Sequence, residues 1–345
     1  MALSRRITVL VVAMLTLLVA VPLAAQPVKL VAESYHVPTR DPGIQLHVRN
    51  KRPAGMTQFS AEKTLLYVHG TSQAASSTFD LALDGISWMD YIAQRGYDVY
   101  LVDLRGYGGS TRPPEMERPA ADNPPIVRTD VAVKDVEAAV DHILARRGLT
   151  TLNVMGWSWG TAIMGRYATQ HSDKVHRLVL YAPPWTSEAP TTGSQAPLGA
   201  YQTWTMEQAR SRLQNGAPEE KKKDLMPDAW FETWSAAVLA TDPVGAKQTP
   251  PVVRTPNGTV QDTREYWLAG RALWEPSGIK APTLIVVGEW DAGTPVAGAQ
   301  AVFGKLSNAP YKRLVQIGEG THVIFLEKNS MHLFREVQLF LDEER

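Results

Sequence analysis

Residues 152–168 read LNVMGWSWGTAIMGRYA, and this stretch decides the fold. A short apolar run leads into Gly156-Trp157-Ser158-Trp159-Gly160, and a helix-compatible segment follows. A serine flanked by glycine two positions before and after, between a strand and a helix, is typical of a nucleophile elbow. The turn must be tight enough to raise the serine hydroxyl above the sheet edge, and side chains at the flanking positions would collide. We therefore predict that Ser158 is a nucleophile.

Short apolar runs alternate with helical patterns on both sides of this stretch. The apolar runs predict further strands, at residues 28–37, 44–48, 64–68, 98–103, 177–182, 282–287 and 313–317. Apolar residues at helical spacing, with suitable stop signals, predict helices at residues 88–94, 130–147 and 331–342. Strands alternating with helices in this way favour an α/β fold with a parallel sheet and right-handed crossovers.

The alternation of strands and helices breaks between Pro183 and about Pro276. This segment is polar, contains prolines, is mainly helical in composition and holds six of the ten tryptophans of the chain. We interpret it as a cap laid over the sheet. The predicted organisation is a core in two parts, residues 26–183 and 277–345, with a cap at residues 184–276 inserted between them.

The first residues differ from the rest of the chain. Arg5 and Arg6 precede an apolar run of about 14 residues, and small residues lead up to Ala25, which is the pattern of a secretory signal peptide. The run is short for a membrane span, which needs roughly 20 apolar residues. We predict a signal peptide at residues 1–25 and export to the periplasm or the medium. Because Leu23 is a poor residue three positions before the cleavage point, an uncleaved anchor stays open as an alternative.

Composition excludes several classes of function. The formal net charge is zero, so nothing indicates a nucleic-acid partner. The chain has no cysteine, which excludes disulfides and thiolate chemistry. No metal-ligand spacing and no phosphate-binding loop is present, and we expect that neither a metal nor a cofactor is required.

A serine nucleophile needs a base, and the base needs an acid to orient it. In a doubly wound sheet these partners come from loops at the carboxyl ends of later strands. Asp291 follows the predicted strand at 282–287, and His322 follows the one at 313–317. The predicted triad is therefore Ser158, Asp291 and His322, in the chain order expected of this architecture. Glu289 and Glu188 remain alternative candidates for the acid.

The oxyanion that develops during acyl transfer needs two backbone donors, each contributing roughly 3 kcal/mol in the transition state. The N–H of Trp159, directly after the nucleophile, is one predicted donor. The N–H of Thr71, in the loop after the strand at 64–68, is the other, and His69 is expected to support that loop by hydrogen bonding. Trp157 and Trp185 lie nearest in sequence to predicted catalytic loops, and we predict that they contact the substrate.

Taken together, the chain resembles the α/β-hydrolase superfamily over nearly all its mature length. The matching motifs are those at residues 69–71, 103–108, 156–160, 288–291 and 320–322. This resemblance implies an eight-stranded, mostly parallel sheet with a cap after the sixth strand. The element Ser158-Trp159-Gly160 is similar to that of proline iminopeptidases, but their His-Gly-Gly-Pro-Gly loop is absent here. Serine at the elbow argues against epoxide hydrolases and haloalkane dehalogenases, which carry aspartate there.

The expected activity is hydrolysis of a small ester, thioester or lactone through an acyl-enzyme. One alternative is an aminopeptidase or iminopeptidase, which would recognise a free amine through acidic cap residues such as Glu188, Glu207 and Asp228. Acyl transfer on the same triad is a second alternative. A catalytically inactive binding protein on this fold is a third.

Overall fold

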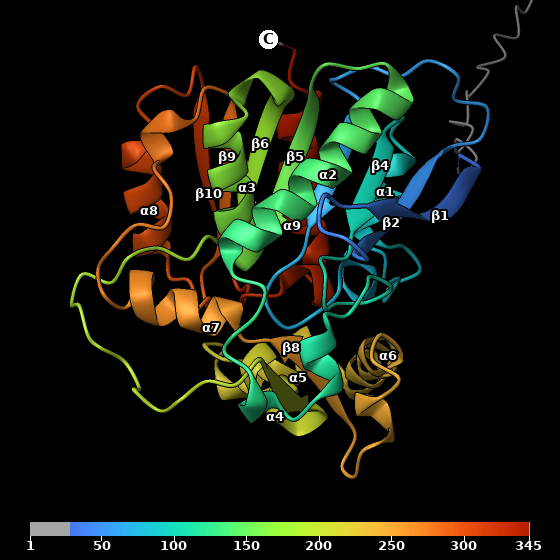
Figure 1. The fold of residues 1–345 in the computed structure, drawn as a ribbon. Coiled ribbons are helices and arrows are strands. Elements are labelled where there is room, and N and C mark those ends of the chain that lie inside the picture. Colours follow the sequence, from blue (N-terminus) through green and yellow to red (C-terminus); the bar gives the residue numbers. More distant parts are fainter. Residues whose placement is uncertain (1–27, 345) are drawn as a thin grey trace, which may run out of the picture.

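A computed structural model describes residues 28–344 of the chain (Figure 1). The predicted signal peptide at residues 1–25 lies outside the described residues. Within residues 28–344, no helix has both the length and the apolar character needed to cross a bilayer.

An eight-stranded sheet forms the centre of the molecule. Its order is β1-β2-β4-β3-β5-β6-β9-β10. β2 runs antiparallel to both of its neighbours, and all the other pairs are parallel. The strands are β1 (Leu30–Pro38), β2 (Gln45–Pro53), β3 (Thr64–Val68), β4 (Asp98–Val102), β5 (Leu152–Trp157), β6 (Val175–Tyr181), β9 (Thr283–Gly288) and β10 (Lys312–Ile317). This confirms the predicted sheet.

Helices cover both faces of the sheet, as Figure 1 shows. α2 (Thr129–Arg147), α3 (Trp159–Gln170) and α8 (Val296–Lys305) pack on one face, where their apolar residues share a core with β5 and β6. α1 (Trp88–Ala93) and α9 (Ser330–Asp342) pack on the other face. Because both faces are covered, β3, β4 and β5 are buried along their whole length. The sequence pattern did not predict α8.

The segment between β6 and β9 contains β7 (Tyr201–Thr205), α4 (Met206–Leu213), α5 (Glu219–Leu225), α6 (Asp228–Ala240), β8 (Val252–Pro256) and α7 (Gly258–Asp262). β7 and β8 pair antiparallel in a small separate sheet, which the sequence analysis did not foresee. These elements gather at one end of the main sheet (Figure 1). We call this segment the insertion.

Two buried ion pairs help to fix these elements. Arg105, after β4, binds Asp135 of α2 with its Nη2 at 2.5 Å from Oδ1. In the insertion, Arg254 of β8 binds Asp242 at 2.7 Å, and its other amino group donates to the carbonyl of Met116 in the core. The second pair therefore links the insertion to the core.

Candidate active site

The turn between β5 and α3 has the geometry of a nucleophile elbow. Ser158 has φ 54° and ψ −121°, a strained conformation for a residue with a side chain. A Cβ on Gly156 would lie 2.2 Å from the carbonyl oxygen of Gly160, and a Cβ on Gly160 would lie 2.4 Å from that of Val68. Glycine is therefore required on both sides of Ser158, as the sequence pattern suggested. The Ser158 N–H donates to the carbonyl of Tyr181 at 2.9 Å, which anchors the turn on β6.

His322 and Asp291 form a hydrogen-bonded pair. Nδ1 of His322 lies 2.8 Å from Oδ2 of Asp291. Asp291 is fully buried at its side chain, whereas the imidazole is 18% exposed. With the proton on Nδ1 shared with the carboxylate, the lone pair of Nε2 is free to accept a proton. Glu289 instead accepts from the backbone N–H of Glu319 at 2.9 Å, so the carboxylate that contacts His322 is Asp291.

Asp291 is held as an acceptor by its own loop. The N–H groups of Gly293 and Thr294 donate to Oδ1 at 3.0 and 2.8 Å, and the Thr294 hydroxyl donates to Oδ2 at 2.6 Å. Burial alone would raise the pKa of Asp291, but the charge and hydrogen bond of His322, with the Thr294 contacts, hold this pKa below its ordinary value. The carboxyl group thus stays ionised and orients the imidazole.

The loop that carries His322 is fixed by two aromatic side chains. Trp157 Nε1 and the Tyr181 hydroxyl both donate to the His322 carbonyl, at 2.9 and 3.0 Å. The rings of Trp157 and His322 are also close, with centroids 5.4 Å apart. Trp157 therefore positions His322 in addition to lining the cavity described below.

The loop after β3 lies directly against the elbow. A Cβ on Gly70 would come within 3.1 Å of the Ser158 Cβ. The buried His69 bridges two backbones, because its Nδ1 lies 2.7 Å from the Gly70 carbonyl and its Nε2 accepts from the N–H of Leu104 at 3.1 Å. Burial lowers the pKa of His69, which favours the neutral ring that this bridge requires. The predicted support of this loop by His69 is thus present in the structure.

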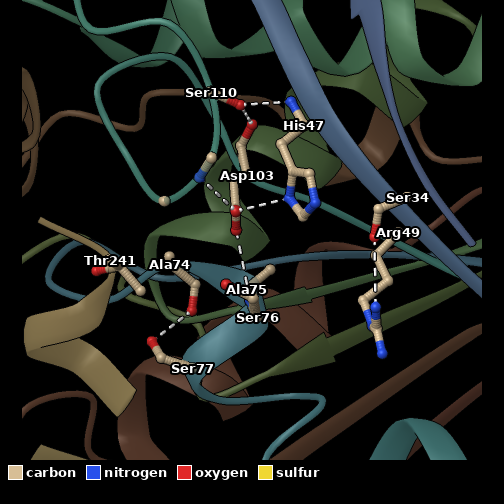
Figure 2. A network of polar contacts seen from close by, with 12 residues as sticks. Ser34, His47, Arg49, Ala74, Ala75, Ser76, Ser77, Asp103, Ser110 and Thr241 are labelled. Atoms are coloured by element: carbon tan, nitrogen blue, oxygen red, sulfur yellow. Dashed lines mark hydrogen bonds and ion pairs between the residues drawn. The ribbon is translucent and has the colours of Figure 1, made fainter. Parts of the chain in front are cut away.

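The turn after β4 braces the same loop. The Tyr107 hydroxyl donates to the Thr71 carbonyl at 2.7 Å. Figure 2 shows the Asp103 carboxylate at the centre of this turn, with His47 and the backbone of Ser76 as partners; the Asp103–His47 distance is 3.0 Å. Burial would raise the pKa of Asp103, but the hydrogen bond and charge of His47 hold it below its ordinary value. This glycine-rich stretch is therefore a structural turn.

Two cavities meet at the elbow. The narrow cavity, about 40 Å³, is mostly apolar and is lined by residues of α4, α6 and β8 together with Trp157. The broad cavity, about 470 Å³, is bordered by α7 and the loop after β9. Five residues line both cavities: Thr71, Ser158, Trp204, Arg212 and His322. Three of these are predicted site residues, brought together from the ends of β3, β5 and β10.

Two further predicted site residues are the oxyanion donor Trp159 and the substrate contact Trp185. Trp159 begins α3, so its N–H belongs to a helix N-terminus, and its buried indole donates to Thr129 at 2.8 Å. Trp185 packs edge-on against Trp274 and lines a neighbouring hollow whose lining includes neither Ser158 nor His322. The substrate contact predicted for Trp185 stays a prediction, from a position beside the site.

Sequence reasoning missed two residues of this site. Thr294 was detectable, because Asp291-Ala292-Gly293-Thr294 is a pattern that favours an Asx-type turn closing on the carboxylate. Arg212 was not detectable, because it lies in a polar helix whose docking on the core has no local signal. Within residues 28–344, no group of three or more acidic or histidine side chains is arranged to hold a metal ion.

Comparison with known proteins agrees with this architecture. The family model for the alpha/beta hydrolase fold matches residues 63–329, well over half of the chain. The chain therefore belongs to the α/β-hydrolase family and is a hydrolase by that membership. No curated protein sequence matches it.

Solved structures of similar fold have low sequence identity. A hydrolase from Pseudomonas aeruginosa PA01 is 18% identical with a TM-score of 0.60, over 90% of this chain and 98% of that one. A thermophilic esterase from Thermogutta terrifontis is 16% identical with a TM-score of 0.57, over 90% and 98%. A meta-cleavage product hydrolase from Pseudomonas fluorescens IP01 is 17% identical with a TM-score of 0.60, over 89% and 97%. At this identity the likeness concerns the fold alone.

Proposed function

We propose that the protein is a serine hydrolase that cleaves a carboxylic ester, thioester or lactone through an acyl-enzyme. Ser158 attacks the carbonyl carbon while its proton passes to Nε2 of His322. The N–H groups of Thr71 and Trp159 stabilise the oxyanion. His322 then protonates the leaving alcohol or thiol, and water hydrolyses the acyl-enzyme by the same route with His322 as base.

One observation carries this proposal. The strained Ser158 opens into the cavities that His322 also lines, and His322 is hydrogen-bonded to a buried carboxylate that stays ionised. A backbone conformation of this kind is costly and persists where a function requires it. The narrow apolar cavity suits a short apolar substituent, and the broad cavity suits the larger part of the substrate.

The lining of the cavities disfavours the aminopeptidase alternative. The residues around both cavities include no carboxylate, while they include the cation Arg212. Asp228 pairs with Arg210, and Glu207 is exposed, so neither is aimed at Ser158. Recognition of a protonated amine would require an acidic partner that the described lining does not supply.

The test is turnover of a matched panel by the mature protein and its Ser158→Ala variant. The panel contains p-nitrophenyl esters of increasing acyl length, lactones and aminoacyl anilides. We expect ester or lactone turnover that falls by several orders of magnitude in the variant, with an unchanged melting temperature. Anilide turnover alone would move the assignment to a peptidase, and undiminished ester turnover in the variant would exclude Ser158 as the nucleophile.

We also propose that the protein is exported, on the basis of the leader pattern at residues 1–25. Expression of the full chain, cell fractionation and N-terminal sequencing of the product test this directly. A periplasmic product that begins near Gln26 is expected. A full-length product in the cytosolic fraction would contradict export.

A further inference from the structure

Arg212 is a cation at the junction of the two cavities. It lies in the last turn of α4 and is one of the five residues that line both the narrow and the broad cavity, with Ser158 and His322 among the others. Its Nη1 donates to the Ser72 hydroxyl at 2.9 Å, next to the predicted oxyanion donor Thr71. The guanidinium is therefore held against the loop after β3, at the wall shared by the two cavities.

Its position is set by contacts on several sides. The guanidinium carbon lies 4.8 Å from the centre of the Trp204 ring, in a cation–π contact. The next residue, Leu213, accepts a hydrogen bond from the Thr321 hydroxyl at 3.1 Å through its carbonyl. A Cβ on Gly216 would lie 2.1 Å from the Trp290 carbonyl. The end of α4 thus contacts the loops that carry both Asp291 and His322, which preorganises Arg212 toward the site.

The charge of Arg212 has no counter-charge in the described chain. No carboxylate of residues 28–344 lies within 4 Å of this guanidinium, whereas Arg210, two residues earlier on the same helix, pairs with Asp228. The residue is exposed and open to the cavities, and partial desolvation by the surrounding protein lowers the pKa of the guanidinium. An arginine stays charged under these conditions, so the site holds an uncompensated positive charge.

The free edge of the guanidinium indicates which anion fits. Only Nη1 is engaged, by Ser72, which leaves Nε and Nη2 without a partner among the described residues. These two groups form the side-on fork that binds the two oxygens of a carboxylate in parallel. An anionic substrate would supply the counter-charge that the protein lacks.

We propose that Arg212 recognises a carboxylate on the substrate, so that the preferred substrates are anionic esters, such as monoesters of dicarboxylic acids. This inference rests on the proposed hydrolase function of Ser158 and narrows it to a substrate class. It makes Arg212 a specificity-determining residue that contacts the substrate away from the reacting bond.

The kinetic test uses ester pairs of matched chain length in which a methyl group replaces the carboxylate. Monomethyl adipate is paired with methyl hexanoate, which carries a methyl group in place of the carboxylate, and longer and shorter homologous pairs are added. For the alcohol side, 4-carboxyphenyl acetate is paired with 4-methylphenyl acetate. In the native protein, kcat/KM should be higher for the anionic member in at least one series.

The variant Arg212→Gln should lower kcat/KM for the anionic member about 10- to 100-fold, the range of a charge-assisted bidentate contact. The neutral member should change by less than about threefold, because it has no charged group for the guanidinium to bind. Arg212→Lys should retain part of the preference, since it keeps the charge without the fork. The matched control, Arg210→Gln, should leave both members unchanged.

A binding measurement separates this inference from the catalytic one. Calorimetric titration of the Ser158→Ala variant with monomethyl adipate, with and without Arg212→Gln, reports carboxylate recognition even if no ester is turned over. Binding that is lost with Arg212→Gln supports the proposal. The proposal would be overturned if the native protein had equal kcat/KM for the charged and neutral esters in every series. An equal loss of kcat/KM for both members in Arg212→Gln would also overturn it.

Discussion

Glu327 gives a quantitative prediction about pH and stability. Its side chain is only 2% exposed and lies beside Thr321, whose backbone N–H is 3.3 Å from both carboxylate oxygens. Burial raises the pKa of Glu327 from 4.5 to about 7, and the charge of Asp291 adds to this, against the hydrogen bonds from Thr321. The carboxyl group is therefore more easily protonated in the folded protein than in the unfolded chain.

The sign follows from linkage. Because the folded pKa is above the unfolded value, the contribution of Glu327 to stability is complete below pH 4.5 and is lost as the pH rises through about 7. The gap of about 2.5 between the two values, at ~1.4 kcal/mol for each pKa unit, amounts to ~3 kcal/mol. No discount for solvent screening is needed, because the group is buried.

The perturbation is Glu327→Gln, which imitates the protonated acid. The amide oxygen can accept from the Thr321 N–H, and the amide NH₂ can donate to the Thr321 hydroxyl oxygen. In the native protein the Leu213 carbonyl, 3.1 Å from the Thr321 hydroxyl, and the Glu327 carboxylate compete for the one proton of that hydroxyl. In the variant the hydroxyl donates to the Leu213 carbonyl alone. Glutamine thus satisfies the same contacts at every pH.

The assay is urea unfolding of both proteins at pH 5 and pH 8. We expect the variant to exceed the native free energy of unfolding by about 1 kcal/mol at pH 5, where the unfolded glutamate is already mostly ionised, and by about 3 kcal/mol at pH 8. Glu232→Gln, at an exposed position of α6, is the control and should show no such pH-dependent gain. The reasoning would be refuted if the free energy of unfolding of Glu327→Gln differed from that of the native protein by the same amount at both pH values.

Three further substitutions test the packing and the buried charges of the fold. In a thermal melt, Gly160→Ala should prove less stable by about 3 kcal/mol, because its Cβ would meet the backbone oxygens of Val68 and His69, at the end of β3, at 2.4 and 2.7 Å. Gly304→Ala in α8, where a Cβ meets nothing within 4 Å, should be neutral or slightly stabilising in the same thermal melt. Asp242→Asn leaves the buried charge of Arg254 unpaired and should cost about 3 to 5 kcal/mol by urea unfolding. A loss below about 1 kcal/mol would show that water compensates Arg254.

The core of the fold was predictable because its strands are local apolar runs between turn residues. The strand at residues 64–68 has the predicted bounds, and the others differ by a few residues at their ends. The elbow was predictable for a related reason: the two glycines that the tight turn requires, Gly156 and Gly160, lie within five consecutive residues of the sequence. The positions of Asp291 and His322 followed from topology, since parallel strands end at the same edge of a sheet.

The insertion was less predictable because its arrangement depends on distant contacts. The pairing of β7 with β8 joins segments some fifty residues apart that have weak strand patterns, and no turn signal connects them. Arg212 looks like a surface residue of a polar helix until α4 docks on the loops after β9 and β10. Trp185 was chosen for its closeness in sequence to β6, and its packing on Trp274 depends on a residue some ninety positions away that no local pattern indicates.

The most direct test of the account is covalent labelling of Ser158 with a fluorophosphonate, read by peptide mass spectrometry. We predict one adduct per chain, on the peptide containing Ser158, with a labelling rate that falls by several orders of magnitude in His322→Ala. No labelling of the native protein, or labelling of Ser158 at the same rate in His322→Ala, would contradict the claim that these two residues act together as nucleophile and base.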